Sequence, residues 1–181
     1  RFQEGGIFAS WTVITAATFG ENLKAGIETF GGAFFKPNVL FFTMPEESER
    51  REELRTILNA CRDNGIGVLL LHSHADRGFG DRKRINVWFP ERDGDWSLEM
   101  DLGESDLALL AGYKLKSNWR SHLSLIAEVG DRDHTGKARS YLELVMETAR
   151  IPNAESHVVS AGSTGAAPEA DLQIFPIVGE I

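Results

Sequence analysis

The sequence predicts an α/β fold in which a mostly parallel sheet carries helices on both faces. Short apolar runs of strand length alternate along the chain with longer segments whose apolar residues recur every three or four positions. Glycine or proline separates most of these segments. Strands that alternate with amphipathic helices pair in parallel and are joined by right-handed crossovers, so this order indicates a layered α/β architecture.

The first part of the chain predicts three strands and two helices in alternation. Ile7–Ile14 is rich in β-branched and aromatic side chains, which favours a strand. Glu21–Phe30 repeats apolar residues at helical spacing and ends before two glycines, which indicates a helix. Asn38–Phe42 is a compact apolar run that suits a strand buried on both faces. Glu49–Asn64 has one apolar stripe and predicts a surface helix, and Gly67–Leu71 predicts another buried strand.

The middle of the chain predicts a hairpin and a buried helix. Ile85–Phe89 and Trp96–Leu102 both alternate between apolar and polar residues, and turn-forming residues lie between them. We therefore expect an inserted β-hairpin here. The following segment, Asp106–Leu115, is apolar on almost every side, which is typical of a buried helix. We expect Leu110 to be a core residue of this helix.

The last part of the chain returns to the alternation of strands and helices. His122–Val129 predicts a strand, and Lys137–Ala149 predicts a helix that ends before Pro152. Glu155–Ser160 predicts a strand that leads into a loop of small residues. Ala170–Phe175 predicts a final strand after this loop.

The length of 181 residues fits one large domain or two small ones. A folded body of this size buries roughly 70% of the surface that its unfolded chain exposes, so its core needs no disulfide or metal. A polar, glycine-containing stretch at Asp76–Arg84 indicates a seam, but we expect the hairpin to dock on the same sheet. We therefore predict a single α/β domain spanning residues 1–181.

Charge and composition exclude several classes of partner. The net charge of −8 repels phosphate backbones, and no stretch combines clustered basic residues with aromatic ones, so we expect no nucleic-acid binding. The longest aliphatic run, Val68–Leu71, is far shorter than the roughly 20 residues that cross a bilayer. The single cysteine, Cys61, has no partner for a disulfide, which fits a reducing cytosol. The chain begins with Arg1, so we expect a piece of a longer protein.

One motif at the end of a predicted strand has the residue types of a zinc site. It reads His72, Ser73, His74, Ala75 and Asp76. This H-x-H-x-D pattern resembles the metal motif of metallo-β-lactamase-like hydrolases, in which imidazole and carboxylate groups bind zinc. That family has a histidine directly after the aspartate, where this chain has the cation Arg77. We therefore favour a polar loop with solvated histidines, and we keep a metal-dependent hydrolase using this motif as the alternative function.

Other chemical motifs are weaker. Gly162–Gly165 resembles a phosphate-binding glycine turn, but no helix pattern follows it, and no complete nucleotide-binding motif is present. Glu99 and Asp101 share one strand face, as paired carboxylates do in glycoside hydrolases, but a solvated hairpin face explains them more simply. The sequence also lacks a G-x-S-x-G nucleophile motif. We expect no catalytic residue, no cofactor and no enzyme activity.

Four segments occur in an order that resembles one known family. They are Lys36–Leu40 with Pro37 and Asn38, Ile85–Trp88, Asp106–Leu115 followed by Trp119 and Leu123–Ile126, and Ala170–Pro176. Their order resembles the cytoplasmic C-terminal domain of cation-chloride cotransporters, in the amino acid-polyamine-organocation transporter superfamily. In that family an aspartate stands at Asn86 and a second tryptophan stands near Phe89. Residues 90–104 lack the eukaryotic D-G-G-L pattern, which indicates a prokaryotic member.

The resemblance implies a fold, a location and partners. It implies a universal-stress-protein-like domain of two halves, of which this chain holds mainly the later half and residues 1–14 the end of the earlier one. The domain would regulate and assemble a transporter on the cytoplasmic face of the cell membrane. Its partners would be its own transmembrane domain, which moves chloride with potassium, sodium or both, and a second copy in a homodimer.

The resemblance also assigns structural rather than ligand-binding roles to its motif residues. These residues are Pro37, Asn38, Trp88, Leu110, Tyr113 and Trp119. Large side chains with one polar atom are more often packing residues than ligand contacts. As candidates for a dimer surface we take the aromatic residues Phe79, Phe89 and Trp96, which we expect to be exposed.

Overall fold

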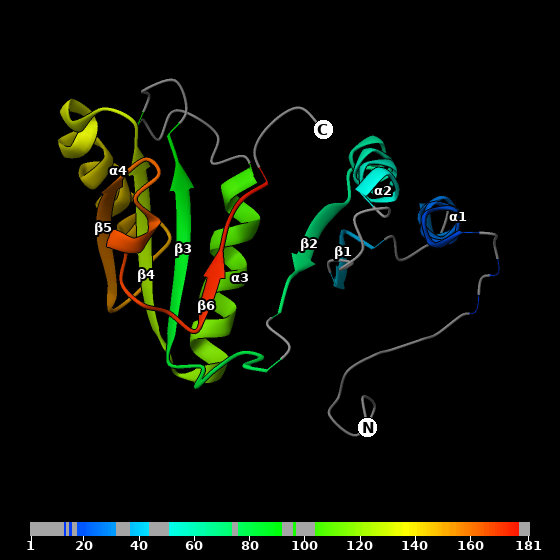
Figure 1. Cartoon of the computed structure of the whole chain (residues 1–181), viewed down its shortest axis with the longest axis horizontal. Coiled ribbons are helices and arrows are strands. Elements are labelled where there is room, and N and C mark those ends of the chain that lie inside the picture. Colours follow the sequence, from blue (N-terminus) through cyan, green and yellow to red (C-terminus); the bar gives the residue numbers. More distant parts are fainter. Residues whose placement is uncertain are drawn as a thin grey trace. The chain divides into compact units, whose positions relative to one another are not determined.

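The computed structural model divides the chain into two compact units, Arg1–His72 and Ser73–Glu180, with Ile181 assigned to the first (Figure 1). It describes Val13, Thr15, residues 18–31, 37–43, 51–73, 76–91, Trp96 and residues 104–177. Each unit has its own sheet and its own core. The boundary lies just before the predicted seam at Asp76–Arg84. The strand predicted at Ile7–Ile14 falls outside the described residues apart from Val13.

The described residues of unit 1 form two strands and two helices. Its elements are α1 (Phe19–Gly31), β1 (Val39–Thr43), α2 (Arg51–Asp63) and β2 (Gly67–Leu71). The two strands pair in parallel, with Val39 opposite Gly67. The core of this unit gathers Ile27, Ile57, Ala60, Cys61 and Ile66. The alternation predicted for residues 21–71 is therefore confirmed.

The end of α2 shows why a glycine follows this helix. Gly65 has a φ of 63°, a left-handed conformation that costs glycine little. The backbone N–H of Ile66 donates to the carbonyl oxygen of Cys61 at 2.8 Å, and that of Gly65 donates to Arg62 at 3.0 Å. These bonds satisfy helix carbonyls and turn the chain directly into β2.

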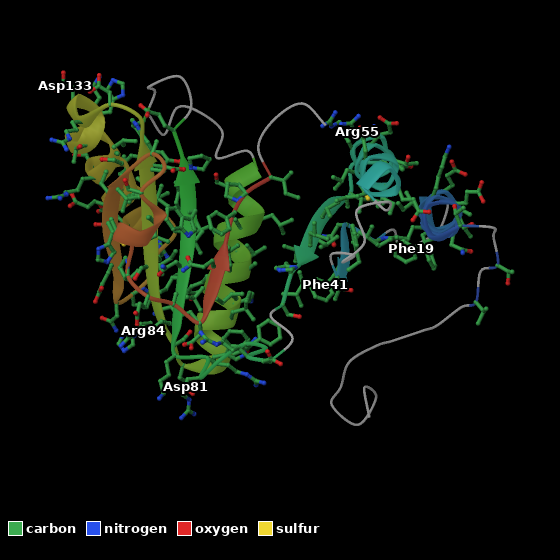
Figure 2. All side chains as sticks on the ribbon, in the orientation of Figure 1. Phe19, Phe41, Arg55, Asp81, Arg84 and Asp133 are labelled. Carbon is green, nitrogen blue, oxygen red and sulfur yellow. The ribbon has the colours of Figure 1, made fainter. Side chains whose placement is uncertain are left out.

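Strand β1 is covered on one face within unit 1. Leu40 and Phe42 pack against the core, whereas Phe41 between them is 62% exposed (Figure 2). The prediction that this strand is buried on both faces is therefore wrong for the described part of unit 1. Successive side chains of a strand point to opposite faces, and the described helices of this unit, α1 and α2, contribute to a core on only one of them.

Unit 2 is built around a parallel sheet with strand order β5-β4-β3-β6. Its elements are β3 (Arg84–Pro90), α3 (Glu104–Trp119), β4 (His122–Val129), the 3₁₀ turn η2 (Arg132–His134), α4 (Thr135–Thr148), β5 (Ala154–Ser160), the 3₁₀ turn η3 (Thr164–Ala166) and β6 (Leu172–Ile174). The predicted α/β class and the predominantly parallel pairing are confirmed.

Strand β3 lies inside this sheet. It pairs in parallel with β4 on one edge and with β6 on the other, and Ile85–Phe89 is buried throughout. The first strand of the predicted hairpin is therefore a central strand with both faces covered. Residues 97–102 of the expected second strand lie outside the described residues, and Trp96 is not in a strand.

The two α-helices described in unit 2, α3 and α4, lie on the same face of the sheet. One core cluster joins Val87 of β3 and Leu125 of β4 to Leu109 of α3 and Leu142 of α4. The opposite face carries Trp88, Ile126 and Val159, and the connection between β5 and β6 packs there through Ala167 (Figure 1). Among the described residues of unit 2, both α-helices therefore cover one face, and the cover on the other face comes from the connection that contains the 3₁₀ turn η3. Crossovers of one hand that advance in one direction, from β3 to β4 to β5, place their helices on one side.

Helix α3 packs on the sheet through small residues. Ala108 and Leu109 are 5% and 6% exposed, and a Cβ added at Gly112 would lie 2.5 Å from Cγ2 of Val87. Leu110 instead points outward and is 54% exposed, so the prediction that it is a core residue is wrong. The sequence of a helix that is apolar on most sides does not reveal which side faces the sheet. In α3 the side that carries Gly112 faces the sheet, because only glycine fits against Val87.

Leu109 and Leu110 form a matched pair for measuring this orientation. Leu109→Ala should lower the free energy of unfolding by about 2 to 5 kcal/mol because it removes buried methyl groups and leaves a cavity. Leu110→Ala should change it by no more than about 0.5 kcal/mol. Urea unfolding of both variants at low protein concentration measures the difference. Equal losses in the two variants would contradict the observed orientation of α3.

Gly112→Ala should destabilise the chain although alanine favours helices. The added methyl group overlaps Val87, and overpacking of this kind costs about 1 to 3 kcal/mol. Gly136 of α4 is the control, because a Cβ there meets no atom within 4 Å. Gly136→Ala should be neutral or stabilising by up to about 1 kcal/mol in the same unfolding measurement. A stabilised Gly112→Ala variant would show that α3 does not depend on this contact.

Candidate functional site

Ligands of parallel α/β sheets bind at the carboxyl ends of the strands. The loops that follow the strands of unit 2 are therefore the first place to look for a site. Strand β3 leads into Glu91, β4 into Gly130 and β5 into the loop that contains Gly162. Asp133 marks this end of unit 2 in Figure 2, and Arg84 marks the opposite, amino end.

Glu91 connects two of these loops. Its carboxylate accepts hydrogen bonds from the backbone N–H of Gly130 and from Nδ1 of His134, the residue that precedes α4. The Gly130 amide is the main cause that lowers the pKa of Glu91, and the His134 hydrogen bond adds to it. Glu91 therefore ties the end of β3 to the loop that starts α4.

Glu128 occupies the glycine loop that resembles a phosphate cradle. Its Oε1 accepts a hydrogen bond from the backbone N–H of Gly162 at 3.0 Å. The next amide, of Ser163, donates to Ser160 at 2.9 Å, and that of Ala166 donates to Ser163 at 2.8 Å. A carboxylate therefore lies where a phosphate would need the Gly162 amide, and like charges repel. This arrangement disfavours nucleotide binding at the loop.

Asp171 also accepts hydrogen bonds from backbone N–H groups, at the end of the sheet where the strands begin. Its carboxylate accepts hydrogen bonds from the backbone N–H groups of Lys83 at 2.8 Å and of Asp81 and Arg84 at 3.0 Å. These bonds, that of Lys83 first, hold the pKa of Asp171 below its ordinary value. Gly80 has a φ of 53°, and a Cβ there would lie 2.5 Å from Oδ1 of Asp171. Asp171 thus fastens the turn before β3 to the start of β6.

These three carboxylates act on the protein's own backbone. Glu91, Glu128 and Asp171 each accept an N–H from a loop distant in sequence, so these hydrogen bonds join separate parts of the fold. Sequence reasoning noticed Asp171 only within the final strand segment. Its partners lie about 90 positions earlier in the chain, and no periodic pattern signals a contact of that kind.

The residues of the alternative metal motif are not assembled among the described residues. His72 is exposed, and His74 lies outside the described residues. In the part of the chain that the structure describes, no group of three or more histidine, cysteine or acidic side chains is placed to hold a metal ion. The metal-dependent hydrolase remains a hypothesis from sequence without support from geometry.

The predicted structural residues occupy varied environments. Pro37 and Asn38 are both exposed just before β1, and the carbonyl oxygen of Asn38 accepts a hydrogen bond from the backbone N–H of Gly67 at 2.8 Å. Trp88 is 3% exposed, and its indole N–H donates to Gln173 at 2.7 Å. Tyr113 lies half-buried beside the core cluster of unit 2.

The aromatic residues that we proposed as a dimer surface are packing residues instead. Phe89 is 2% exposed in the core. The ring of Phe79 lies 5.6 Å from that of Trp119, and the ring of Trp96 lies 5.5 Å from that of Tyr141. The expectation that these residues are exposed is therefore wrong for Phe89, and the other two are already in contact within the chain.

Asp171→Asn should lower the free energy of unfolding by about 1 to 3 kcal/mol at pH 7, because an amide replaces a charged acceptor of three N–H groups. The folded pKa of Asp171 is lowered, so its stabilisation is present above the unfolded pKa of about 3.9 and is lost as the pH falls through the folded pKa. The difference between variant and parent should therefore shrink below about pH 4. Denaturant unfolding between pH 3 and 7 would measure it.

Glu169→Gln is the matched control for this experiment. Glu169 is an exposed carboxylate two residues upstream. Its replacement should change stability by no more than about 0.5 kcal/mol at any of these pH values. If Asp171→Asn behaved like Glu169→Gln, the carboxylate at Asp171 would not be the fastening for this turn.

Comparisons with known proteins agree with the geometry. The family model for the first C-terminal domain of prokaryotic cation-chloride cotransporters matches residues 1–79, and that for the second matches residues 80–181. A crystal structure of the cytoplasmic domain of a prokaryotic cation chloride cotransporter is similar, with 40% sequence identity and a TM-score of 0.85. The alignment covers 96% of this chain, which spans 65% of the length of that one.

One further comparison and one property of the helices bear on the family of this chain. A search of the curated proteins gives no match. None of the described helices is long and apolar enough to cross a membrane. The two consecutive family matches and the structural similarity confirm the family that the sequence motifs indicated, and the chain belongs to the C-terminal domains of prokaryotic cation-chloride cotransporters.

Proposed function

We propose that this chain is a regulatory and dimerisation domain on the cytoplasmic face of the membrane, and that it acts by contact rather than by catalysis. The observation that supports this most directly is the pair of consecutive family matches, which together cover residues 1–181. The attached transmembrane domain would carry out the secondary active symport of chloride with potassium, sodium or both. This chain would influence that transport through its contacts with the transmembrane domain and with a second copy.

The geometry of unit 2 is consistent with a role that needs no substrate. At the two edges of the sheet, Glu91, Glu128 and Asp171 are engaged by backbone N–H groups of the same chain. General acid–base catalysis needs a titratable group within hydrogen-bond reach of a substrate. Carboxylates whose oxygens accept hydrogen bonds from the chain's own backbone are poorly suited to that task, because those oxygens are already engaged.

Deletion of residues 80–181 from the intact transporter tests this function. The deletion removes the part matched by the second family model, which apart from Ile181 lies within compact unit 2. We expect the fraction of crosslinked dimer to fall and chloride-dependent cation flux per transporter at the membrane to change. Flux, membrane abundance and dimer content are measured together, and the transporter with Gly136→Ala serves as the control. If all three quantities matched the unaltered transporter, the regulatory and assembly roles would both be wrong.

A further inference from the structure

The outer face of α3 has an exposed leucine at its centre. Leu110 is 54% exposed, although the helix belongs to the better packed of the two units and its other side covers the sheet. Leu107, three positions earlier and next to Leu110 on the helix surface, is only half-buried. A single exposed leucine does not by itself require a partner, so the residues around it have to indicate one.

The charges beside Leu110 indicate what kind of partner fits. Asp106, Leu110 and Lys114 lie four residues apart and therefore form one stripe along the helix. Asp106 and Lys114 are both exposed, and neither forms an ion pair or a side-chain hydrogen bond with another described residue. The stripe is thus acidic toward its first end, apolar in the middle and basic toward its last end, with about 12 Å between the two charged positions.

A stripe with this order is complementary to itself when it is reversed. If two copies of α3 pack antiparallel about a two-fold axis at Leu110, the two leucines meet. Asp106 of each copy then lies opposite Lys114 of the other. A parallel arrangement would instead bring like charges together. Interfaces with two-fold symmetry use the same patch on both subunits, so self-complementarity is the property they require.

We infer that the Asp106–Leu110–Lys114 stripe of α3 is a contact surface between two copies of this chain, with the helices antiparallel. This inference rests on the proposed dimerisation and names the surface that performs it. One pair of helices is small beside the roughly 1,600 Å² of a standard interface, so the contact alone would be weak. Two copies attached to neighbouring membrane domains meet at an effective concentration of the order of millimolar, which makes a weak contact sufficient.

The neighbouring helix α4 supplies a matched control. Leu144 is 45% exposed, which is close to the exposure of Leu110. Its neighbours four positions away on either side are Ser140 and Thr148, which carry no charge. An exposed leucine alone would therefore make the two helices equivalent, whereas the charge pattern distinguishes α3.

Charge exchange in the intact transporter tests the inference. With Leu110→Cys in the background, oxidation should crosslink two copies, because the thiols face each other at the axis. Asp106→Lys or Lys114→Asp alone creates two like-charge contacts and should slow crosslinking by about tenfold or more. The double variant Asp106→Lys with Lys114→Asp restores opposite charges and should return the rate to within about twofold of the parent.

The outcomes separate this surface from dimerisation itself. Leu144→Cys should crosslink at least about tenfold more slowly than Leu110→Cys. Suppose that native mass measurements show a dimer. If Leu110→Cys then fails to crosslink, or if the double variant crosslinks as slowly as the single variants, the α3 surface is wrong and dimerisation stands. If the transporter is monomeric by native mass measurement, both the surface and the proposed assembly role fail.

Discussion

Unit 2 depends on a close contact between helix α3 and strand β3 that only a glycine allows. Gly112 lets α3 lie so close to β3 that even a methyl group would overlap Val87. This contact fixes the rotation of the helix about its axis, because only one side of α3 carries both Gly112 and Ala108 toward the sheet. The rotation in turn buries Leu109 and directs Leu110 outward. The core and the exposed stripe of α3 therefore have one common cause.

The ends of the strands in unit 2 carry acidic side chains that accept hydrogen bonds from backbone amides. Folds of this class often hold an anion at the amides that follow their strands. Here Glu91 and Glu128 supply the anion from within the chain, and Asp171 does the same at the opposite edge. The fold keeps the donors that a ligand site would use, but its own carboxylates satisfy them. Architecture and activity are thus separable, and function has to be argued from the particular residues present.

Periodicity predicted the elements well and their surroundings poorly. The run Ile85–Phe89 was enough to predict a strand, but its alternation did not reveal that parallel strands pair with it on both sides. The pattern of α3 predicted a helix but not its rotation, because leucines occupy both sides and one glycine decides between them. The fastening by Asp171 escaped prediction because it joins residues about 90 positions apart. The motif order succeeded where periodicity failed, since it reflects the whole chain rather than a local window.

The buried position of Cys61 has a consequence for the chemistry of the folded chain. This residue is the only cysteine, it is 1% exposed in the core of unit 1, and burial raises the pKa of its thiol. Oxidants and alkylating reagents attack the exposed thiolate, and the native state presents almost none of it. Burial therefore protects the thiol of Cys61 from oxidation while unit 1 is folded. The rate at which a thiol reagent labels Cys61 therefore measures how often unit 1 opens, because the thiol reacts only when the core of that unit is exposed.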